Sequence, residues 1–191
     1  AAVQESYFNQ SAYTFLSILG RVNYDFDGKY LLSVTARRDG SSRFGRNKQW
    51  GLFPAVSLGY NISEEPFFDG LKKTVNYLKI RASYGISGNA EIGNYNYAST
   101  YGQANYNGAN GITLANVGDD ELGWESAYQT NLGLSLQMFD GKFRLDVDVY
   151  EKLTKDLLLP YPVSVVSGVT SVTTNLGEIE NKGIEAMVGV T

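Results

Sequence analysis

Apolar and polar side chains alternate with a period of two between residues 124 and 138. Six of the eight even positions in this stretch are apolar or aromatic, whereas Ala127 is the only apolar residue at the seven odd positions. Such alternation predicts a β-strand with one apolar face and one polar face. The stretch is longer than the roughly five or six residues of an average strand in a soluble sheet, and this length favours a strand that spans a membrane.

A tight turn is predicted directly after this stretch, at Asp140-Gly141, because this pair favours the type I′ turn of short hairpins. The alternation resumes at Phe143 with the opposite parity. With Asp140-Gly141 as the loop, Met138 falls opposite Phe143, and the apolar side chains of both strands share one face. Residues 124–155 therefore predict a transmembrane β-hairpin.

Five further strands follow from the same alternation, at residues 16–26, 30–37, 50–62, 75–86 and from residue 184 onward. Gly28 is expected in the left-handed backbone of a three-residue turn between the first two strands. The connections alternate between short ones, at 27–28, 63–74 and 140–141, and long ones, at 38–49, 87–121 and 156–175. Short periplasmic turns and long extracellular loops are typical of outer-membrane barrels. The sequence predicts an all-β fold that is part of a large antiparallel transmembrane β-barrel, with about seven strands present.

Aromatic residues gather near both ends of the predicted strands, as in the two girdles of a membrane barrel. Near the short turns these are Tyr24, Phe26, Tyr30, Tyr60, Tyr77, Phe139 and Phe143, and near the long loops Trp50, Tyr84, Trp124 and Tyr128. Between the girdles, the side chains expected to face lipid are Leu32, Val34, Leu58, Ile80, Leu132, Leu134, Leu136, Val147 and Val149. A soluble β-sandwich, acting as a binding or adhesion module, would show the same alternation and remains an alternative.

Composition excludes several classes of function. The chain of 191 residues contains no Cys and no His, so thiolate nucleophiles, the commonest general base and the commonest transition-metal ligand are absent. We therefore predict no enzymatic activity, no cofactor and no metal site, and Asp119-Asp120-Glu121 lacks the ligand spacing of a calcium loop. A net charge of −4 argues against nucleic-acid binding. The chain also shows neither a signal peptide nor a run of about 18 apolar residues that would form a transmembrane helix.

Seven segments, spread nearly from end to end, resemble the SusC/RagA-type TonB-dependent outer-membrane transporters in order and spacing. They are LGRVNY at 19–24, ARRDGSSRFG at 36–45, WGLFPA at 50–55, LKIRASYG at 78–85, WE at 124–125 followed by NLG at 131–133, the segment 150–158, and NLGEIENKGIE at 175–185.

This resemblance implies a large barrel of about 22 strands with a plug inside it. It implies an importer of oligosaccharides or peptides in the outer membrane of a Gram-negative bacterium, surrounded by outer-membrane lipid. The implied partners are a SusD-like surface lipoprotein and, through the plug region, TonB. Relative to the family, the plug and most strands are missing, so we expect residues 1–191 to be a partial barrel domain. A passive, porin-like barrel is the second alternative.

Two sets of residues are candidates for contact with a transported solute. On the polar face, a lumen-facing set could line the substrate path, or could simply form mutual ion pairs in a hydrated interior: Arg21, Arg37, Lys79, Arg81, Arg144, Asp146 and Asp148. In the longest connection, a ligand-binding set combines rings that could stack on a sugar with amides that could bond to it: Tyr95, Tyr97, Tyr101, Tyr106, Asn94 and Asn105. A loop that packs on itself or on the lipoprotein is the simpler explanation for the second set.

Overall fold

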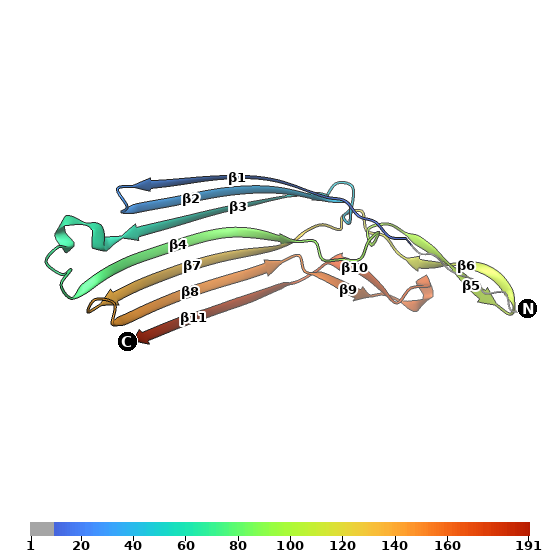
Figure 1. Cartoon of the computed structure of the whole chain (residues 1–191). Coiled ribbons are helices and arrows are strands. Elements are labelled where there is room, and N and C mark those ends of the chain that lie inside the picture. The colour runs from blue at the N-terminus through green and yellow to red at the C-terminus, as the bar shows by residue number, and fades with distance from the viewer. Residues whose placement is uncertain (1–9) are drawn as a thin grey trace, which may run out of the picture.

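The computed structural model describes residues 10–191, half of which form one curved antiparallel sheet (Figure 1). The sheet has seven strands in the order β1-β2-β3-β4-β7-β8-β11, which confirms the predicted number. The strands are β1 (Phe15–Phe26), β2 (Tyr30–Ser41), β3 (Trp50–Asn61), β4 (Val75–Asn89), β7 (Glu125–Met138), β8 (Phe143–Lys155) and β11 (Glu178–Val190). Each is 12 to 15 residues long, which is enough to cross a bilayer at a tilt.

The pairing register divides the sheet into an apolar face and a polar face. Residues that pair across antiparallel strands lie on the same face, so each row of partners can be followed through the sheet. One row consists of Leu32, Leu58, Ala82, Leu132, Val149 and Ile184. The next row, one residue along each strand, consists of Ser33, Ser57, Ser83, Asn131, Tyr150 and Gly183. The alternation predicted from the sequence is therefore confirmed across six neighbouring strands.

The short turns lie together at one end of the sheet (Figure 1). Phe26 pairs with Tyr30 across a three-residue turn in which Gly28 has a φ of +65°, as predicted. Met138 pairs with Phe143, and Asp140 and Gly141 have φ values of +57° and +79°. Positive φ at both central residues is what a type I′ turn requires. The third short connection contains the 3₁₀ turns η1 (Ile62–Glu64) and η2 (Pro66–Phe68).

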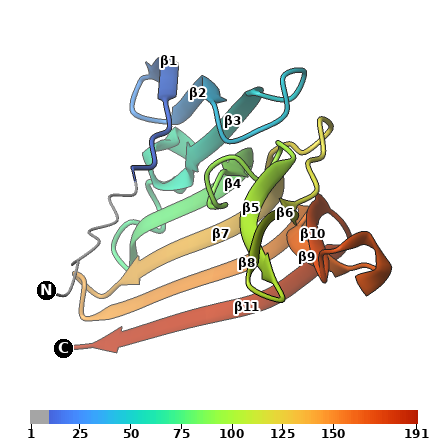
Figure 2. The same ribbon diagram turned by 90° about the vertical axis from the view of Figure 1, so that its right-hand side faces the viewer.

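The long connections at the other end are more structured than predicted. The connection between β4 and β7 holds a hairpin of β5 (Thr100–Tyr106) and β6 (Ala109–Asn116). The connection between β8 and β11 holds β9 (Leu158–Pro162), the 3₁₀ turn η3 (Val165–Ser167) and β10 (Ser171–Asn175). Figure 2 shows both hairpins in front of this end of the sheet. Treating these segments as loops was wrong, because a hairpin that stands apart from the sheet needs no continuous apolar face.

Two aromatic residues do not take part in the girdles as predicted. Tyr77 pairs with Gln137 in a polar row, after a register shift between Val75 and Tyr77. Trp124 lies in an aromatic cluster at the long-connection end, where its ring meets Phe53 and its indole N–H donates to the carbonyl of Gln49 at 3.1 Å. Tyr77 alternates with Leu78 and Ile80 and so belongs to the polar face, whereas Trp124 precedes the first residue of β7, so the alternation of that strand does not fix its direction.

The sheet is one layer thick, and within residues 10–191 no second sheet packs against it as a sandwich would require. β1 and β11 are its two edges, so the described strands do not close a barrel. The buried apolar side chains are few and lie mostly outside the main sheet: Phe44, Phe53, Phe68, Leu122 and Val169. Among the described residues, no helix has the length and hydropathy needed to span a membrane.

Candidate functional site

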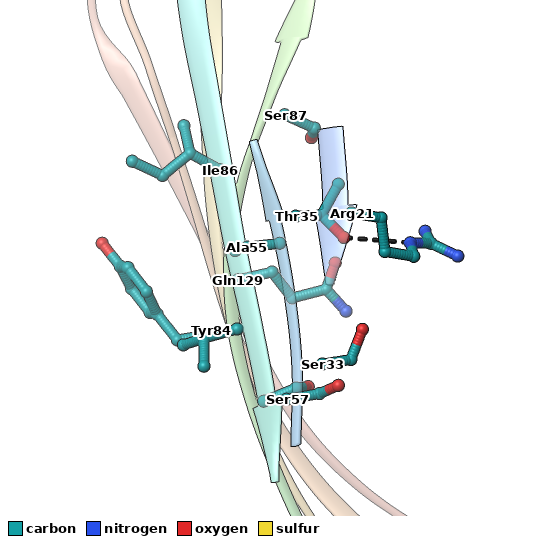
Figure 3. A pocket seen from close by; sticks show the side chains of 12 residues that line it. Arg21, Ser33, Thr35, Ala55, Ser57, Tyr84, Ile86, Ser87 and Gln129 are labelled. Atoms are coloured by element: carbon teal, nitrogen blue, oxygen red, sulfur yellow. Dashed lines mark hydrogen bonds between the residues drawn. The ribbon is translucent and has the colours of Figure 1, made fainter. Parts of the chain in front are cut away.

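The polar face of the sheet carries the first set of candidate residues. Figure 3 shows Arg21, Ser33 and Ser57 on one side of the sheet, whereas Tyr84 and Ile86 point to the other side. A shallow cavity of about 480 Å³ lies over these strands. Within it, Nε of Arg21 donates to Oγ1 of Thr35 at 3.0 Å. Small hydroxyl side chains thus leave the middle of this face open.

Three of the predicted lumen-facing residues are brought together by a network across β4, β7 and β8. Nη2 of Arg81 lies 2.9 Å from Oδ2 of Asp148, and Nη1 donates to Oγ of Ser135 at 3.1 Å. The Ser135 hydroxyl in turn donates to Oδ1 of Asp146 at 2.6 Å. Arg81 is neutralised within the wall, which matches the simpler of the two interpretations of this set.

Gly133 makes this ion pair geometrically feasible. It lies on β7 between Arg81 and Asp148, opposite both of them in the register. A Cβ atom at residue 133 would overlap Oδ1 of Asp148 and would lie 2.7 Å from Nη2 of Arg81. Any larger residue would occupy the space through which Arg81 reaches across β7.

The remaining predicted lumen-facing residues share the polar face without joining this network. Arg37 forms an ion pair with Asp39, with 2.8 Å between Nε and Oδ2. Lys79 pairs in register with Ser135, and Arg144 with Gln137, so both lie in polar rows near the short turns. The structure therefore places all seven residues on one face but gathers only Arg81, Asp146 and Asp148.

An aromatic cluster fills the long-connection end of the sheet, where the pairing of β3 with β4 stops at Ala55 opposite Gly85. The ring of Trp124 lies 4.9 Å from that of Phe44 and 5.2 Å from that of Phe53, measured between centroids. Pro54 precedes the last paired residue and has no N–H to donate to the β4 ladder. The ring of Phe53 lies over Gly51 and Gly88, where a Cβ atom would overlap it, so these two glycines make room for the cluster on the polar face.

Charged residues surround this cluster and connect distant segments. Asp39 is only 1% exposed and accepts a hydrogen bond from Ser17 besides its ion pair with Arg37. The guanidinium of Arg43 stacks 3.9 Å from the centre of the Tyr13 ring and donates to Oδ1 of Asn94 at 2.9 Å. A cavity of about 370 Å³ lies among these residues. Asp39 and Arg43 fall in the segment 36–45, which carries part of the family resemblance, and the sequence assigned neither of them a specific role.

The predicted ligand-binding residues of the longest connection are not gathered at one point. Asn94 bonds with Arg43 and donates to Oγ of Ser11 at 2.6 Å, so its amide already has protein partners. Tyr95 and Tyr97 lie in the turn before β5, whereas Tyr101, Asn105 and Tyr106 follow one another along β5. From Tyr101 to Tyr106 the strand rises by about 17 Å. The side chain of Tyr106 lies outside the described part of the structure.

Asn175 forms hydrogen bonds that join the connection between β4 and β7 to the connection between β8 and β11. Its Oδ1 accepts from the backbone N–H of Gly123 at 2.7 Å, and its Nδ2 donates to the carbonyls of Gly123 and Asp156 at 3.0 and 2.8 Å. Beside it, the hydroxyl of Thr174 donates to Oδ2 of Asp119 at 3.0 Å. Asp119 therefore serves as a hydrogen-bond acceptor, and in the described part of the chain no group of three or more acidic or metal-binding residues is placed to hold an ion.

Comparisons with known proteins agree with this architecture. A family model described as "TonB dependent receptor-like, beta-barrel" matches residues 2–190. A TonB-dependent receptor of Formosa agariphila is 42% identical over 173 residues, which cover 90% of this chain and 17% of the relative. The TonB-dependent receptor SusC of Bacteroides thetaiotaomicron is 33% identical over 193 residues, covering 92% of this chain and 19% of SusC.

Solved structures of transporters are also similar to this chain. The RagAB peptide transporter aligns with a TM-score of 0.85 and 33% identity, covering 92% of this chain and 20% of that chain. The RagAB peptide importer in its "open-open" state aligns with a TM-score of 0.82. The chain spans about a fifth of the length of the relatives that it matches. On this evidence, the chain belongs to the family of TonB-dependent receptor-like β-barrels and is of the SusC/RagA type.

Proposed function

We propose that the seven strands form part of the barrel wall of a TonB-dependent importer in the outer membrane of a Gram-negative bacterium. The division of the sheet into two faces carries the proposal. Large apolar side chains on the apolar face are exposed on every strand, for example Leu58 at 56% and Ile184 at 74%. Water would solvate such a continuous surface poorly, whereas lipid would cover it. The relatives are named as receptors and transporters, in keeping with the prediction that the chain is not an enzyme.

The polar face is then the lumen side of the wall. Arg81, Asp146 and Asp148 would lie in a hydrated interior, next to the plug and the path of the solute. The short turns would lie in the periplasm, and the long connections at the cell surface. In this orientation, the hairpins β5–β6 and β9–β10 meet the solute or a SusD-like lipoprotein first. TonB would act through a plug region, and the solute would be an oligosaccharide or a peptide.

The proposal can be tested by measuring whether substrate uptake depends on TonB and on the proton gradient of the inner membrane. We expect a strain that lacks the full-length protein to lose uptake of its oligosaccharide or peptide substrate, and the intact gene to restore it. Uptake by the restored strain should stop when a protonophore collapses the inner-membrane proton gradient or when TonB is deleted. Labelled-substrate accumulation measures the effect. Uptake that continues without TonB would identify the passive, porin-like barrel instead.

Deletion of residues 94–107 tests the role of the longest connection. We propose that this segment recognises the solute, because it presents Tyr95 and Tyr101 with ring faces open to solvent. The deletion in the full-length protein is expected to abolish substrate binding while the lipoprotein still co-purifies. A matched control removes Val165 and Val166 from the tip of the other hairpin, where no tyrosine or asparagine is lost. Loss of the lipoprotein would instead assign the segment to docking, and unchanged uptake would reject both roles.

A further inference from the structure

The connection between β3 and β4 is held against the apolar face of the sheet by Glu65. Oε1 of Glu65 accepts hydrogen bonds from the hydroxyls of Tyr30 and Tyr60, at 2.7 and 3.2 Å. The two tyrosine rings pair in register and stack with 5.0 Å between their centroids and 6° between their planes. Nζ of Lys29 lies 3.8 Å from Oε2 of the same carboxylate. These contacts fix the start of η2 on the side that we assign to lipid.

Lys29 keeps its charge in this arrangement. Its ammonium lies 3.1 Å from a carboxylate oxygen of Asp27. The hydrogen bond to Asp27 raises the pKa of Lys29, and the charge of Glu65 acts in the same direction. The ammonium of Lys29 therefore lies between the carboxylates of Asp27 and Glu65, and two tyrosine hydroxyls donate to Glu65 from the other side.

Beyond this anchor, the segment turns apolar side chains outward. Phe67 is 72% exposed and Leu71 is 56% exposed, whereas Phe68 between them is only 4% exposed. Two lysines follow, and Lys72 is held 2.9 Å from Oδ1 of Asp69, which raises its pKa. Lys73 is exposed. Two apolar side chains beside two ammonium groups form a short amphipathic element next to the girdle of Tyr30 and Tyr60.

The position of this element in the sheet limits what can cover it. β3 and β4 are interior strands, flanked by β1 and β2 on one side and by β7, β8 and β11 on the other. Further barrel strands would pair with the edges β1 and β11, whereas this element connects two interior strands. A plug inside the barrel would meet the polar face, whereas Glu65 holds the element to the apolar face. The surface that covers the apolar face is therefore the one nearest to the segment that carries Phe67 and Leu71.

We propose that residues 66–73 bind phospholipid at the periplasmic leaflet of the outer membrane. Phe67 and Leu71 insert where the acyl chains meet the headgroups, a depth of about 5–10 Å for interfacial elements. The ammonium of Lys73 donates to a phospholipid phosphate, as long cationic side chains do at membrane boundaries. This inference rests on the proposed function, because it needs the apolar face to lie in lipid.

Spin labels on single cysteines test the site. Residues 1–191 contain no cysteine, and any cysteine elsewhere in the full-length protein is replaced by serine first. The full-length protein, labelled at Phe67→Cys or Leu71→Cys, is reconstituted into vesicles of phosphatidylethanolamine and phosphatidylglycerol. Both labels are expected to collide several-fold more with oxygen, which partitions into lipid, than with a water-soluble nickel chelate. A label at Asn110→Cys on the exposed β5–β6 hairpin should collide mainly with the chelate.

A label at Leu132→Cys, in the middle of the apolar face, separates this inference from the proposed function. If it is protected from the chelate while the labels at residues 67 and 71 are not, the lipid site is rejected and the barrel proposal stands. If the label at residue 132 also collides with the chelate, the barrel proposal itself fails. In the Leu71→Cys background, Lys73→Gln should make the label lie shallower, and an unchanged depth would reject the phosphate contact.

Discussion

Replacing Leu134 with arginine is expected to destabilise the folded barrel by about 2–4 kcal/mol, the range for a cationic side chain at the midplane of a lipid-facing strand. Leu134 lies near the middle of β7 and pairs with Ile80 on β4 and Val147 on β8. An arginine there would lie among the apolar side chains of β4, β7 and β8, with no water to solvate its charge. The fraction of full-length protein that migrates as the folded form on unheated SDS gels should fall sharply, and urea unfolding in lipid vesicles gives the free-energy change.

Gln129→Arg is the matched control for this substitution. Gln129 lies on the same strand but on the opposite face, in the cavity lined by Arg21 and Ser57. A charge there remains in contact with water if the polar face is the lumen. We expect little change in the folded fraction. Equal damage by both substitutions would show that the two faces are not lipid and water, and would overturn the assignment of the faces.

Truncating Phe44 to alanine is expected to release the aromatic cluster at the cell-surface end. Phe44 is fully buried against Trp124, and removal of a buried phenylalanine side chain typically costs about 3–5 kcal/mol. The loss should fall mainly on the connection between β2 and β3. Because about 1.4 kcal/mol corresponds to a tenfold change in an equilibrium constant, amide exchange there should accelerate by about two to four orders of magnitude.

Limited proteolysis gives a second readout for the Phe44→Ala substitution. The same connection carries trypsin sites at Arg43, Arg46 and Lys48. In the wild-type protein these sites lie beside the cluster, whereas in the variant they should be cleaved early. Tyr101→Ala, which removes an aromatic ring that is 71% exposed, is the control and should leave the cleavage pattern unchanged. Wild-type resistance in the Phe44 variant would mean that the cluster does not hold this connection.

The sheet could be predicted from the sequence because every strand has one apolar face, and a period of two marks such a strand without knowledge of its neighbours. The hairpin β5–β6 was missed for the opposite reason, since an isolated two-stranded ribbon carries no such stripe. One local signal was nevertheless present. Asn107-Gly108 has φ values of +49° and +82°, and this pair is the most favoured turn sequence of a tight hairpin.

The contacts of the candidate site were harder to predict because they join residues far apart in the sequence. Arg43 reaches Asn94 across 51 positions, and Arg81 reaches Asp148 across 67 positions. Composition indicated that a polar face would contain ion pairs, but not which arginine would pair with which carboxylate. The pairing depends on the register of three strands and on the missing side chain of Gly133, neither of which is encoded by any local pattern.

The small size of the side chains in the middle of the polar face affects how a solute would move along it. Its central rows consist largely of serine, alanine, glycine and asparagine, and Gly133 leaves the space in which Arg81 pairs with Asp148 across β7. A solute or a displaced folded segment moving along these rows meets mainly small side chains, and the charge of Arg81 there is already paired with Asp148. This part of the wall would therefore hold a moving solute only weakly. Contacts that slow the solute would lie instead at the cell-surface end, where Arg43 and the aromatic cluster are located.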